Sequence, residues 1–384
     1  MTSTSVAPLE QRLLSGSGRH GPLPDLSGPD IIAMAREAGL TGRGGAGFPV
    51  WRKLAAVAAS GRPAVVIANA AEGEPRSAKD KTLLAAAPEL IVDGLRLVAR
   101  ATGAQATYLY APAAAHDSLR NLPVELRTAP DAFVAGEESA AVAAVTGRGA
   151  VPADKRIRIT ESGAGGAPTL VQNVETLAHL ALIARHGPGW FRSAGTADEP
   201  GTFLATIGGA VQRPGAVVEA GYGVTLGDLI AAAGGPSFRL RAVLIGGYHG
   251  GWVPADPALP VSRAALAPYG ASPGAGVVVA LPTVSCGLVE TSRIATYLAR
   301  ESAGQCGPCV NGLPRMAQTL ADLAARRSRP GLPAEVERLA RLVTGRGACR
   351  HPDGTARLVL SAMRTFAPDV TAHLHGHCLA EEAR

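Results

Sequence analysis

The sequence predicts an α/β protein built in three parts: a mostly parallel α/β domain, a small mixed β domain and a C-terminal helical bundle. Strand patterns alternate with helical patterns up to about residue 195, short apolar runs follow over residues 201–280, and helical periodicity takes over from Glu290 onward. The length of 384 residues agrees with several parts, because one hydrophobic core seldom serves a chain this long.

The first part is expected at residues 29–195, after a Ser/Gly/Pro-rich stretch, residues 1–28, that we expect to be flexible. Pro29–Ala38 predicts a short helix, since a proline suits the first turn and Gly39 suits the C-terminal stop. Apolar runs and helical spacing predict five further elements: strands at Ala64–Asn69, Ala106–Ala111 and Ala132–Ala135, and helices at Pro88–Thr102 and Leu170–Ala184.

The second part is expected at residues 200–282 and the third at residues 288–376. Four short apolar runs predict the strands of the second part: FLATIGGAV, AVVEAGY, AVLIGGY and GVVVAL, with one helix near Leu226–Ala233. Helical spacing predicts the bundle of the third part: Arg293–Ala299, Leu313–Arg326, Pro333–Thr344 and Thr355–Phe366.

The composition favours a cytoplasmic globular protein. Hydrophobic residues make up 47% of the chain, yet no stretch reaches the roughly 18 apolar residues of a membrane span, and residues 1–24 lack the apolar region of a secretory signal. The net charge of +6 comes from scattered basic residues, and three Trp and six Phe offer few stacking faces. This pattern disfavours a nucleic-acid binder and suits an acidic partner or an anionic cofactor.

A glycine-rich loop, Gly42-Arg-Gly-Gly-Ala-Gly47, follows the first predicted helix. It matches G-x-G-x-x-G formally, but a helix precedes it where the dinucleotide-binding fold requires a strand. Successive glycines let backbone N–H groups turn inward as an anion nest, to which Arg43 and Lys53 add positive charge. The loop therefore predicts a phosphate site, with a flexible surface loop as the alternative.

Two pairs of carboxylates come directly after predicted strands. Glu72 and Glu74 follow the strand that ends at Asn69, and Glu137 and Glu138 follow Gly136. In a parallel α/β sheet, ligands bind at the carboxyl ends of the strands, and carboxylates there accept hydrogen bonds from ribose or ribityl hydroxyls. Any single glutamate is more simply a solvated loop charge, but two pairs favour a site.

The five cysteines lie at positions 286, 306, 309, 349 and 378, and a cytoplasmic location favours a metal or redox centre over disulfides. The turn Cys306-Gly-Pro-Cys309 brings two thiols close to one another in sequence. An iron–sulfur cluster, a zinc ion and remnant cysteines without metal remain open alternatives, and Cys286 is equally explained as buried filler.

Five ordered segments resemble the flavin-bearing, NADH-binding subunit of respiratory complex I and its relatives in NAD-reducing hydrogenases and formate dehydrogenases. They are residues 39–49 (GLTGRGGAGFP), 69–75 (NAAEGEP) with Lys79-Asp80, 136–139 (GEES), 168–178 (PTLVQNVETLA) and 301–309 (ESAGQCGPC). The resemblance spans about residues 30–375. It implies a flavin mononucleotide (FMN) domain, a β-grasp domain of the SLBB type and a helical bundle that holds a [4Fe-4S] cluster.

The resemblance also implies roles for individual residues. The FMN contacts would be Gly42, Arg43, Gly44, Gly45, Gly47, Lys53, Asn69, Glu72, Gly136, Glu137 and Asn173. The residues that hold NADH against the flavin would be Phe48, Glu74, Glu138 and Lys155. The cluster ligands would be Cys306, Cys309 and Cys349.

The sequence departs from the family pattern in three respects, at four positions. Ala71 stands where the family has an aspartate, and Ala56 and Arg158 stand where it has adenine-stacking aromatics. Ala303 replaces the first cysteine of the C-x-x-C-x-x-C motif, so a cubane, which needs four ligands, finds three cysteines here. The candidates for the fourth ligand are His351, Asp353, Cys378 and solvent.

We therefore expect an NADH dehydrogenase-like oxidoreductase subunit. It would pass electrons from NAD(P)H through FMN and an iron–sulfur cluster to a ferredoxin-like or other redox subunit, with no direct insertion into a membrane. The alternative is a degenerate paralogue that acts as a docking scaffold, or an FMN protein fed by a donor other than a nicotinamide.

Overall fold

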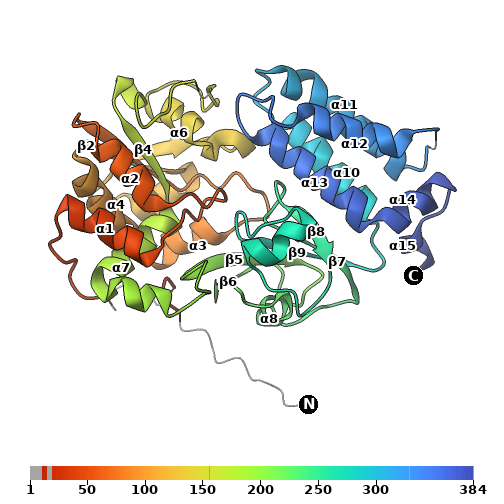
Figure 1. Ribbon diagram of the computed structural model, residues 1–384, viewed down its shortest axis with the longest axis horizontal. Helices are drawn as coiled ribbons and strands as arrows, with labels where there is room; N and C mark the ends of the chain where they lie inside the picture. The colour runs from red at the N-terminus through yellow and green to blue at the C-terminus, as the bar shows by residue number, and fades with distance from the viewer. Residues whose placement is uncertain (1–10, 15–19, 155, 328, 384) are drawn as a thin grey trace, which may run out of the picture.

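A computed structural model describes residues 11–14, 20–154, 156–327 and 329–383. Its first sheet is parallel throughout and has the strand order β3-β2-β1-β4. The strands are β1 (Ala64–Asn69), β2 (Ala104–Pro112), β3 (Glu125–Ala129) and β4 (Thr169–Asn173). The α/β domain, the mixed sheet and the helical bundle are separate regions in Figure 1, with the α/β domain and the bundle on opposite sides.

Helices cover both faces of this sheet, as parallel sheets require. One face packs against α1 (Gly28–Ala38), α2 (Val50–Ala58), α4 (Pro88–Thr102) and α7 (Val174–Arg192). The other face packs against α6 (Glu138–Val145). Alternate side chains of strand β1 point to opposite faces of the sheet. Val66 and Ala68 pack in the core that α1, α2, α4 and α7 cover, whereas Ile67 packs in the core on the α6 side. Shorter elements complete the domain: α3 (Lys79–Ala86), η1 (Ala113–Ala115), α5 (His116–Leu119), η2 (Phe133–Gly136) and η3 (Ala164–Gly166).

Two predicted elements of this domain were wrong. Ala132–Ala135 was expected to be a strand, but Phe133–Gly136 forms a 3₁₀ turn that leads into α6. The strand beside β2 is instead the edge strand Glu125–Ala129, which is only partly buried and so carries no continuous apolar run. The predicted helix Leu170–Ala184 begins as strand β4 and becomes helical at Val174, after Asn173 caps the helix.

The second sheet has the order β6-β5-β9-β7-β8. Its strands are β5 (Thr202–Gly209), β6 (Ala216–Gly221), β7 (Leu240–Ile245), β8 (Gly251–Pro254) and β9 (Val277–Pro282). Strands β5 and β9 are parallel and the other pairs are antiparallel. Helices α8 (Leu226–Ala232) and α9 (Arg263–Leu266) and the 3₁₀ turn η4 (Ala267–Tyr269) accompany the sheet.

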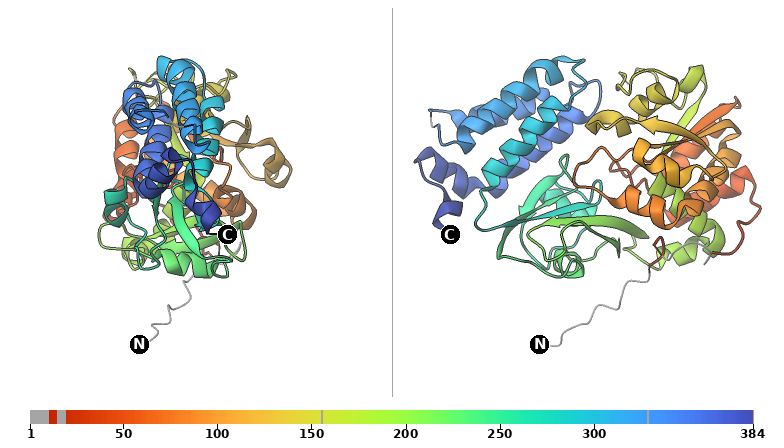
Figure 2. Two further views of the ribbon diagram at one scale, coloured as in Figure 1. Left: turned by 90° about the vertical axis from the view of Figure 1, so that its right-hand side faces the viewer. Right: turned by 180° about the vertical axis from the view of Figure 1, so that it is seen from behind.

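The C-terminal bundle packs on one face of the second sheet. Its helices are α10 (Gly287–Arg300), η5 (Pro308–Gly312), α11 (Leu313–Ala324), α12 (Leu332–Val343), α13 (His351–Thr365), α14 (Ala367–Leu374) and α15 (Leu379–Glu382). Trp252 of β8 is fully buried against α10, and its indole Nε1–H donates to Thr291 Oγ1 at 2.9 Å. The views in Figure 2 show the helices gathered at the end of the molecule that carries the C-terminus.

Part of the N-terminal stretch is anchored, unlike the flexible segment expected for residues 1–28. Leu13 is fully buried, and the backbone N–H groups of Arg12 and Leu13 each donate to Glu219 Oε2 at 2.8 Å. Across the described residues, no helix is both long and apolar enough to span a bilayer.

Candidate functional site

The candidate cofactor site lies at the carboxyl edge of the first sheet. Asn69 and Asn173 end the neighbouring strands β1 and β4 and face each other in the ladder. The Asn69 side-chain amide donates to the Gly136 carbonyl at 2.9 Å, and the Asn173 amide lies 3.5 Å from the Asn69 carbonyl. The structure thus brings together three residues that the sequence placed at the same ligand.

The glycine-rich loop closes over this edge. The Gly42 N–H donates to the Phe48 carbonyl at 2.9 Å, so the loop begins and ends at one point. Gly45 has a φ of 109° and Gly47 a φ of 62°, values that favour glycine. A Cβ on Gly44 would lie 3.3 Å from Asn173 Cβ, so the loop backbone rests against the strand ends.

The Arg43 side chain does not serve the loop as expected. Its guanidinium is buried and donates to the carbonyl oxygens of Thr202, Thr41 and Pro200 at 3.1, 3.0 and 3.3 Å. The guanidinium therefore ties the loop to the second sheet. The prediction that this side chain adds its charge directly to a phosphate is not supported.

Glu137 and Glu138 were expected after a strand, but they follow the 3₁₀ turn η2 and open helix α6. Glu137 is the N-cap of α6, where its Oε2 accepts from the N–H groups of Ser139 and Ala140 at 2.8 and 3.2 Å. Glu138 lies in the first turn of α6, 3.2 Å from Lys53 Nζ on α2. This pair is partly exposed, so both side chains are accessible from solvent beside the site.

Glu72 is committed to helix α3. Its carboxylate accepts from the Ser77 hydroxyl at 2.5 Å and from the N–H groups of Asp80 and Lys81 at 3.1 and 3.2 Å. Donors of this kind at a helix N-terminus favour a negative charge. Glu72 thereby fixes the start of the helix that carries Lys79, and any contact with a ligand would be additional to this role.

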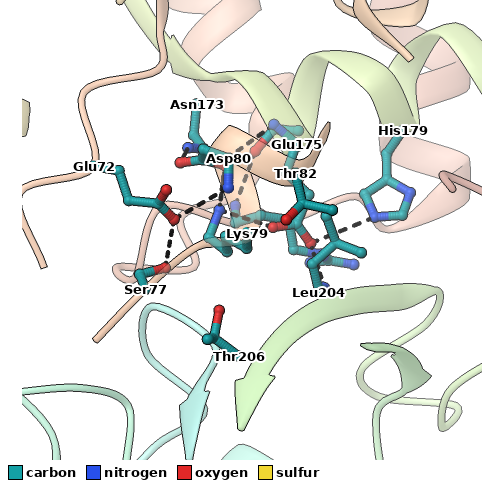
Figure 3. Close-up of polar contacts among 12 residues, drawn as sticks. Glu72, Ser77, Lys79, Asp80, Thr82, Asn173, Glu175, His179, Leu204 and Thr206 are labelled. Atoms are coloured by element: carbon teal, nitrogen blue, oxygen red, sulfur yellow. Dashed lines mark hydrogen bonds and ion pairs between the residues drawn. The ribbon is translucent and has the colours of Figure 1, made fainter. Parts of the chain in front are cut away.

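A buried ion cluster beneath Asn173 was missed as a site in the sequence (Figure 3). Lys79 Nζ lies 2.6 Å from Asp80 Oδ1 and 2.9 Å from Glu175 Oε2, and all three side chains are at most 5% exposed. Although burial opposes it, the two carboxylates hold the pKa of Lys79 above its usual value. The Asn173 amide donates to Asp80 Oδ2 at 2.8 Å, so the cluster orients a residue of the strand edge.

Glu74 lies where the first domain meets the second. Its Oε2 accepts from the Tyr248 N–H at 2.7 Å, and burial raises the pKa of Glu74 to about 7. Phe48, at the end of the glycine-rich loop, is 46% exposed, so part of this large apolar side chain is accessible from solvent. Lys155, the remaining residue expected at NADH, lies outside the described residues.

Cys306, Cys309 and Cys349 meet at one end of the bundle. Partial burial acts against it, but hydrogen bonds from the backbone N–H groups of Ala348 and Cys309 lower the pKa of Cys306. Burial, followed by the neighbouring Cys306 sulfur, raises the pKa of Cys309 to about 12. The Cys306 thiol is therefore more readily ionised than the Cys309 thiol. The backbone N–H of Ala348, which precedes Cys349, helps to stabilise the Cys306 thiolate.

Comparison with known proteins agrees with this geometry. Residues 35–182 match the Nuo51 FMN-binding domain, and residues 290–373 match the NADH-ubiquinone oxidoreductase-F iron-sulfur binding region. The chain is 30% identical over 374 residues to the NADH-quinone oxidoreductase F subunit 2 of Rhizobium meliloti (strain 1021), covering 90% of this chain and 89% of that protein. The chain belongs to the family of NADH-quinone oxidoreductase F subunits.

Other relatives extend this likeness. The NADH-quinone oxidoreductase F subunit of Streptomyces coelicolor is 28% identical over 375 residues, covering 90% of this chain and 83% of that protein. The crystal structure of an NAD+-reducing [NiFe]-hydrogenase in the H2-reduced state superposes with a TM-score of 0.83 at 30% sequence identity. The superposition covers 91% of this chain but 64% of the hydrogenase chain, so this chain is the shorter of the two.

The residues present fit the two cofactors of this family. At the strand edge, the N–H groups of Gly42 and Arg43 are bonded within the protein, so a phosphate would meet the loop at residues 44–47, where Gly44 lies against Asn173. The Asn69 and Asn173 amides, which donate to the Gly136 carbonyl and to Asp80, line the same edge with neutral polar groups. In the bundle, three thiols in one corner fit three of the four ligands that a [4Fe-4S] cluster requires.

Three of the four candidates for the missing cluster ligand are committed elsewhere. His351 uses both ring nitrogens, with Nε2 2.7 Å from the Leu298 carbonyl and Nδ1 3.1 Å from His249 Nε2. Asp353 accepts from the Gly345 N–H and from Arg350 Nη1, each at 2.7 Å. Cys378 lies at the opposite end of the bundle, close to Cys286 and His373. Solvent is therefore the remaining candidate for the fourth ligand of the cluster.

Proposed function

We propose that this chain is the NADH-oxidising flavoprotein subunit of a larger redox assembly. The observation that carries the proposal is the meeting of the glycine-rich loop with Asn69, Gly136 and Asn173, in a chain that also gathers three cysteines in its bundle. When bound, FMN would supply a hydride acceptor and the iron–sulfur cluster a route for single electrons.

The role of the protein side chains and backbone would be to bind FMN and NADH and to orient them. The part of the glycine-rich loop from Gly44 to Gly47 would hold the flavin phosphate through backbone N–H groups, because the N–H groups of Gly42 and Arg43 donate to Phe48 and Thr176. Glu74, which lies against the second domain, and Phe48, at the end of the glycine-rich loop, would hold NADH against the flavin together with Glu138 and Lys155. No side chain is assigned to proton transfer, because a direct hydride transfer from NADH to a bound flavin would require none.

Each of the three regions is assigned its own role. Residues 29–195 form the FMN/NADH-binding domain, residues 200–282 form an SLBB-like β-grasp domain, and residues 288–376 form the iron–sulfur bundle. The close packing of the second domain against the glycine-rich loop, through Arg43 and Thr202, supports this division, because it places the second domain at the rim of the site.

The cluster is proposed to have three cysteine ligands and an exchangeable fourth ligand from solvent. A bound cluster would supply a route for single electrons to a ferredoxin-like or other redox subunit in the cytoplasm. Relatives named as subunits of NADH-quinone oxidoreductase support the expectation of partner subunits.

A glycine substitution tests the flavin site. Gly45→Val should abolish flavin binding, because Gly45 has a φ of 109° and a β-branched residue disfavours that conformation. Gly61→Val is the matched control, since Gly61 also has a positive φ, of 61°, and a Cβ there meets no atom within 4 Å. Flavin released from each purified variant is counted by absorbance.

Full flavin content in a folded Gly45→Val protein would contradict the proposed site. Colourless wild-type protein, without flavin or iron after anaerobic purification, would instead favour the docking scaffold.

A further inference from the structure

A second group of metal-ligating side chains lies away from the flavin and from Cys306. Cys286 precedes α10, His373 lies in the last turn of α14 and Cys378 precedes α15. Cys286 Sγ is 3.4 Å from His373 Nε2, and the ligand atoms of all three residues lie within 4.8 Å of one another. Residues 87 positions apart in sequence therefore converge on one point.

The imidazole is oriented as metal-bound histidines are. His373 Nδ1 lies 3.1 Å from the Leu323 carbonyl, so this nitrogen carries the proton and donates. The Nε2 lone pair is then directed toward the two sulfurs. Metal-ligating histidines almost always donate their other ring N–H to a carbonyl or carboxylate in this way, which fixes the tautomer and raises the basicity of the ligand nitrogen.

Burial and access also suit an ion. His373 and Cys378 are 1% and 4% exposed, so neither side chain is presented to bulk solvent. A pocket of about 390 Å³ lies beside the three residues, and Glu290, Arg326 and Glu381 contribute to its wall. Three protein ligands beside a small pocket leave room for a fourth ligand from solvent.

This group is separate from the proposed iron–sulfur site. Helix α10 begins after Cys286 and ends before Cys306, and its 14 residues span roughly 21 Å at 1.5 Å per residue. Helix α11 follows η5, which contains Cys309, and ends at Ala324 on the wall of the pocket. A single cubane is far too small to reach both groups.

We propose that Cys286, His373 and Cys378 bind a zinc ion in tetrahedral geometry, with solvent as the fourth ligand. Two thiolates and one neutral imidazole are a ligand set that suits zinc, whereas magnesium and calcium prefer oxygen. Both thiols lose their protons when the ion binds. The ion joins the start of α10 to the segment between α14 and α15, and so fastens the C-terminal end of the chain to the bundle.

Metal analysis of the full-length chain tests the site without relying on activity. We expect about one zinc per chain in wild-type protein purified with added zinc. Cys286→Ser and Cys378→Ser should each lower zinc affinity by at least about tenfold, since changes outside the ligand set already cost that much. Both variants should keep the iron content of the wild type. Cys306→Ser is the matched control and should lose iron but keep zinc.

Cobalt(II) gives a second readout on the Cys306→Ser background, where cluster absorbance does not interfere. Visible d–d bands of tetrahedral intensity and a thiolate charge-transfer band are expected, and both should vanish on further substitution of His373 by Gln. The proposal is overturned if wild-type protein retains no zinc after dialysis, if zinc content is unchanged in the Cys286 and Cys378 variants, or if mass spectrometry of freshly purified protein shows a Cys286–Cys378 disulfide.

Discussion

At the scale of single residues, Glu74 links the proposed NADH site to the second domain. Its carboxylate accepts from the N–H groups of Tyr248 and Arg76, at 2.7 and 3.3 Å. A Cβ on Gly247 would approach Glu74 Oε2 to 2.6 Å, so the turn of the second domain lies directly against the carboxyl group. This enclosure raises the pKa of Glu74, so its carboxyl group changes protonation state near neutral pH.

The pH dependence of stability follows from that pKa. The unfolded chain loses the Glu74 proton near pH 4.5, whereas the folded chain keeps it up to about pH 7, so the stability contributed by this residue falls as the pH rises between these values. Glu74→Gln should therefore raise the free energy of unfolding at pH 8, by on the order of 2–3 kcal/mol, and much less at pH 5.

Urea unfolding of the wild type and the variant at both pH values measures this difference. Glu161→Gln, at an exposed position, serves as the control and should change stability equally at both pH values. An equal effect of Glu74→Gln at pH 5 and pH 8 would show that the Glu74 proton is not retained on folding.

The buried cluster around Lys79 gives a second prediction at this scale. Lys79→Met should destabilise the protein by about 3–5 kcal/mol, because it leaves the carboxylates of Asp80 and Glu175 buried without their cation. Arg96→Met, which removes the partly exposed Arg96–Asp93 pair, should cost about 1 kcal/mol or less. Chemical denaturation compares the two, and similar losses in both variants would mean that Lys79 is not the counter-ion of the cluster.

At the scale of elements, helices α4 and α7 approach closely at Gly94. A Cβ there would lie 2.0 Å from the Leu177 carbonyl oxygen, so the backbones touch where a side chain would separate them. Gly94→Ala should cost about 1–3 kcal/mol through this clash, although alanine favours a helix. Gly189→Ala in α7, where a Cβ meets nothing within 4 Å, should be neutral or stabilising. Thermal unfolding measures both, and a stabilised Gly94→Ala protein would rule out the close contact.

Elements with strong periodicity were predictable from the sequence, and those set by tertiary pairing were not. Helix α4 has the predicted bounds Pro88–Thr102, because Pro88 and Gly103 mark its ends. Strand β4 was taken for helix, since the apolar residues of a short, fully buried strand look the same as the first turn of a buried helix. Edge strand β3 carries charged residues and gave no strand signal.

The candidate site was predictable to a similar degree. The convergence of Asn69, Gly136 and Asn173 followed from the family resemblance, which assigned all three to the flavin, whereas only Asn69 ends a strand that the sequence predicted. The roles of Arg43 and Lys79 could not be predicted from the sequence. A charged residue is normally expected at the surface or in a binding site, and only the fold shows that Arg43 is buried against carbonyl groups and Lys79 against carboxylates. The grouping of Cys286 with Cys378 depends on the folding of the whole bundle, which no local pattern encodes.

At the scale of the whole molecule, the flavin edge and the cluster bundle are in direct contact. Phe133, in the turn that ends at Gly136, donates its N–H to Glu301 Oε2 at 3.2 Å. Its ring packs edge-on against His249 and His351, with centroid distances of 4.7 and 5.5 Å. This bridge joins the strand edge of the first domain to the helix that follows Cys349, so the two proposed redox sites meet at one junction.

The proposed function requires that a nicotinamide reduce a flavin held by this chain. Anaerobic titration of the purified holoprotein with NADH, followed by the flavin absorbance, measures this directly. We expect full bleaching, at higher NADH concentrations than in relatives with more aromatics, because a stacking ring contributes roughly 1–3 kcal/mol and Ala56 and Arg158 stand where two such rings would lie. A flavin that stays oxidised with both NADH and NADPH, yet bleaches with dithionite, would contradict the proposed function.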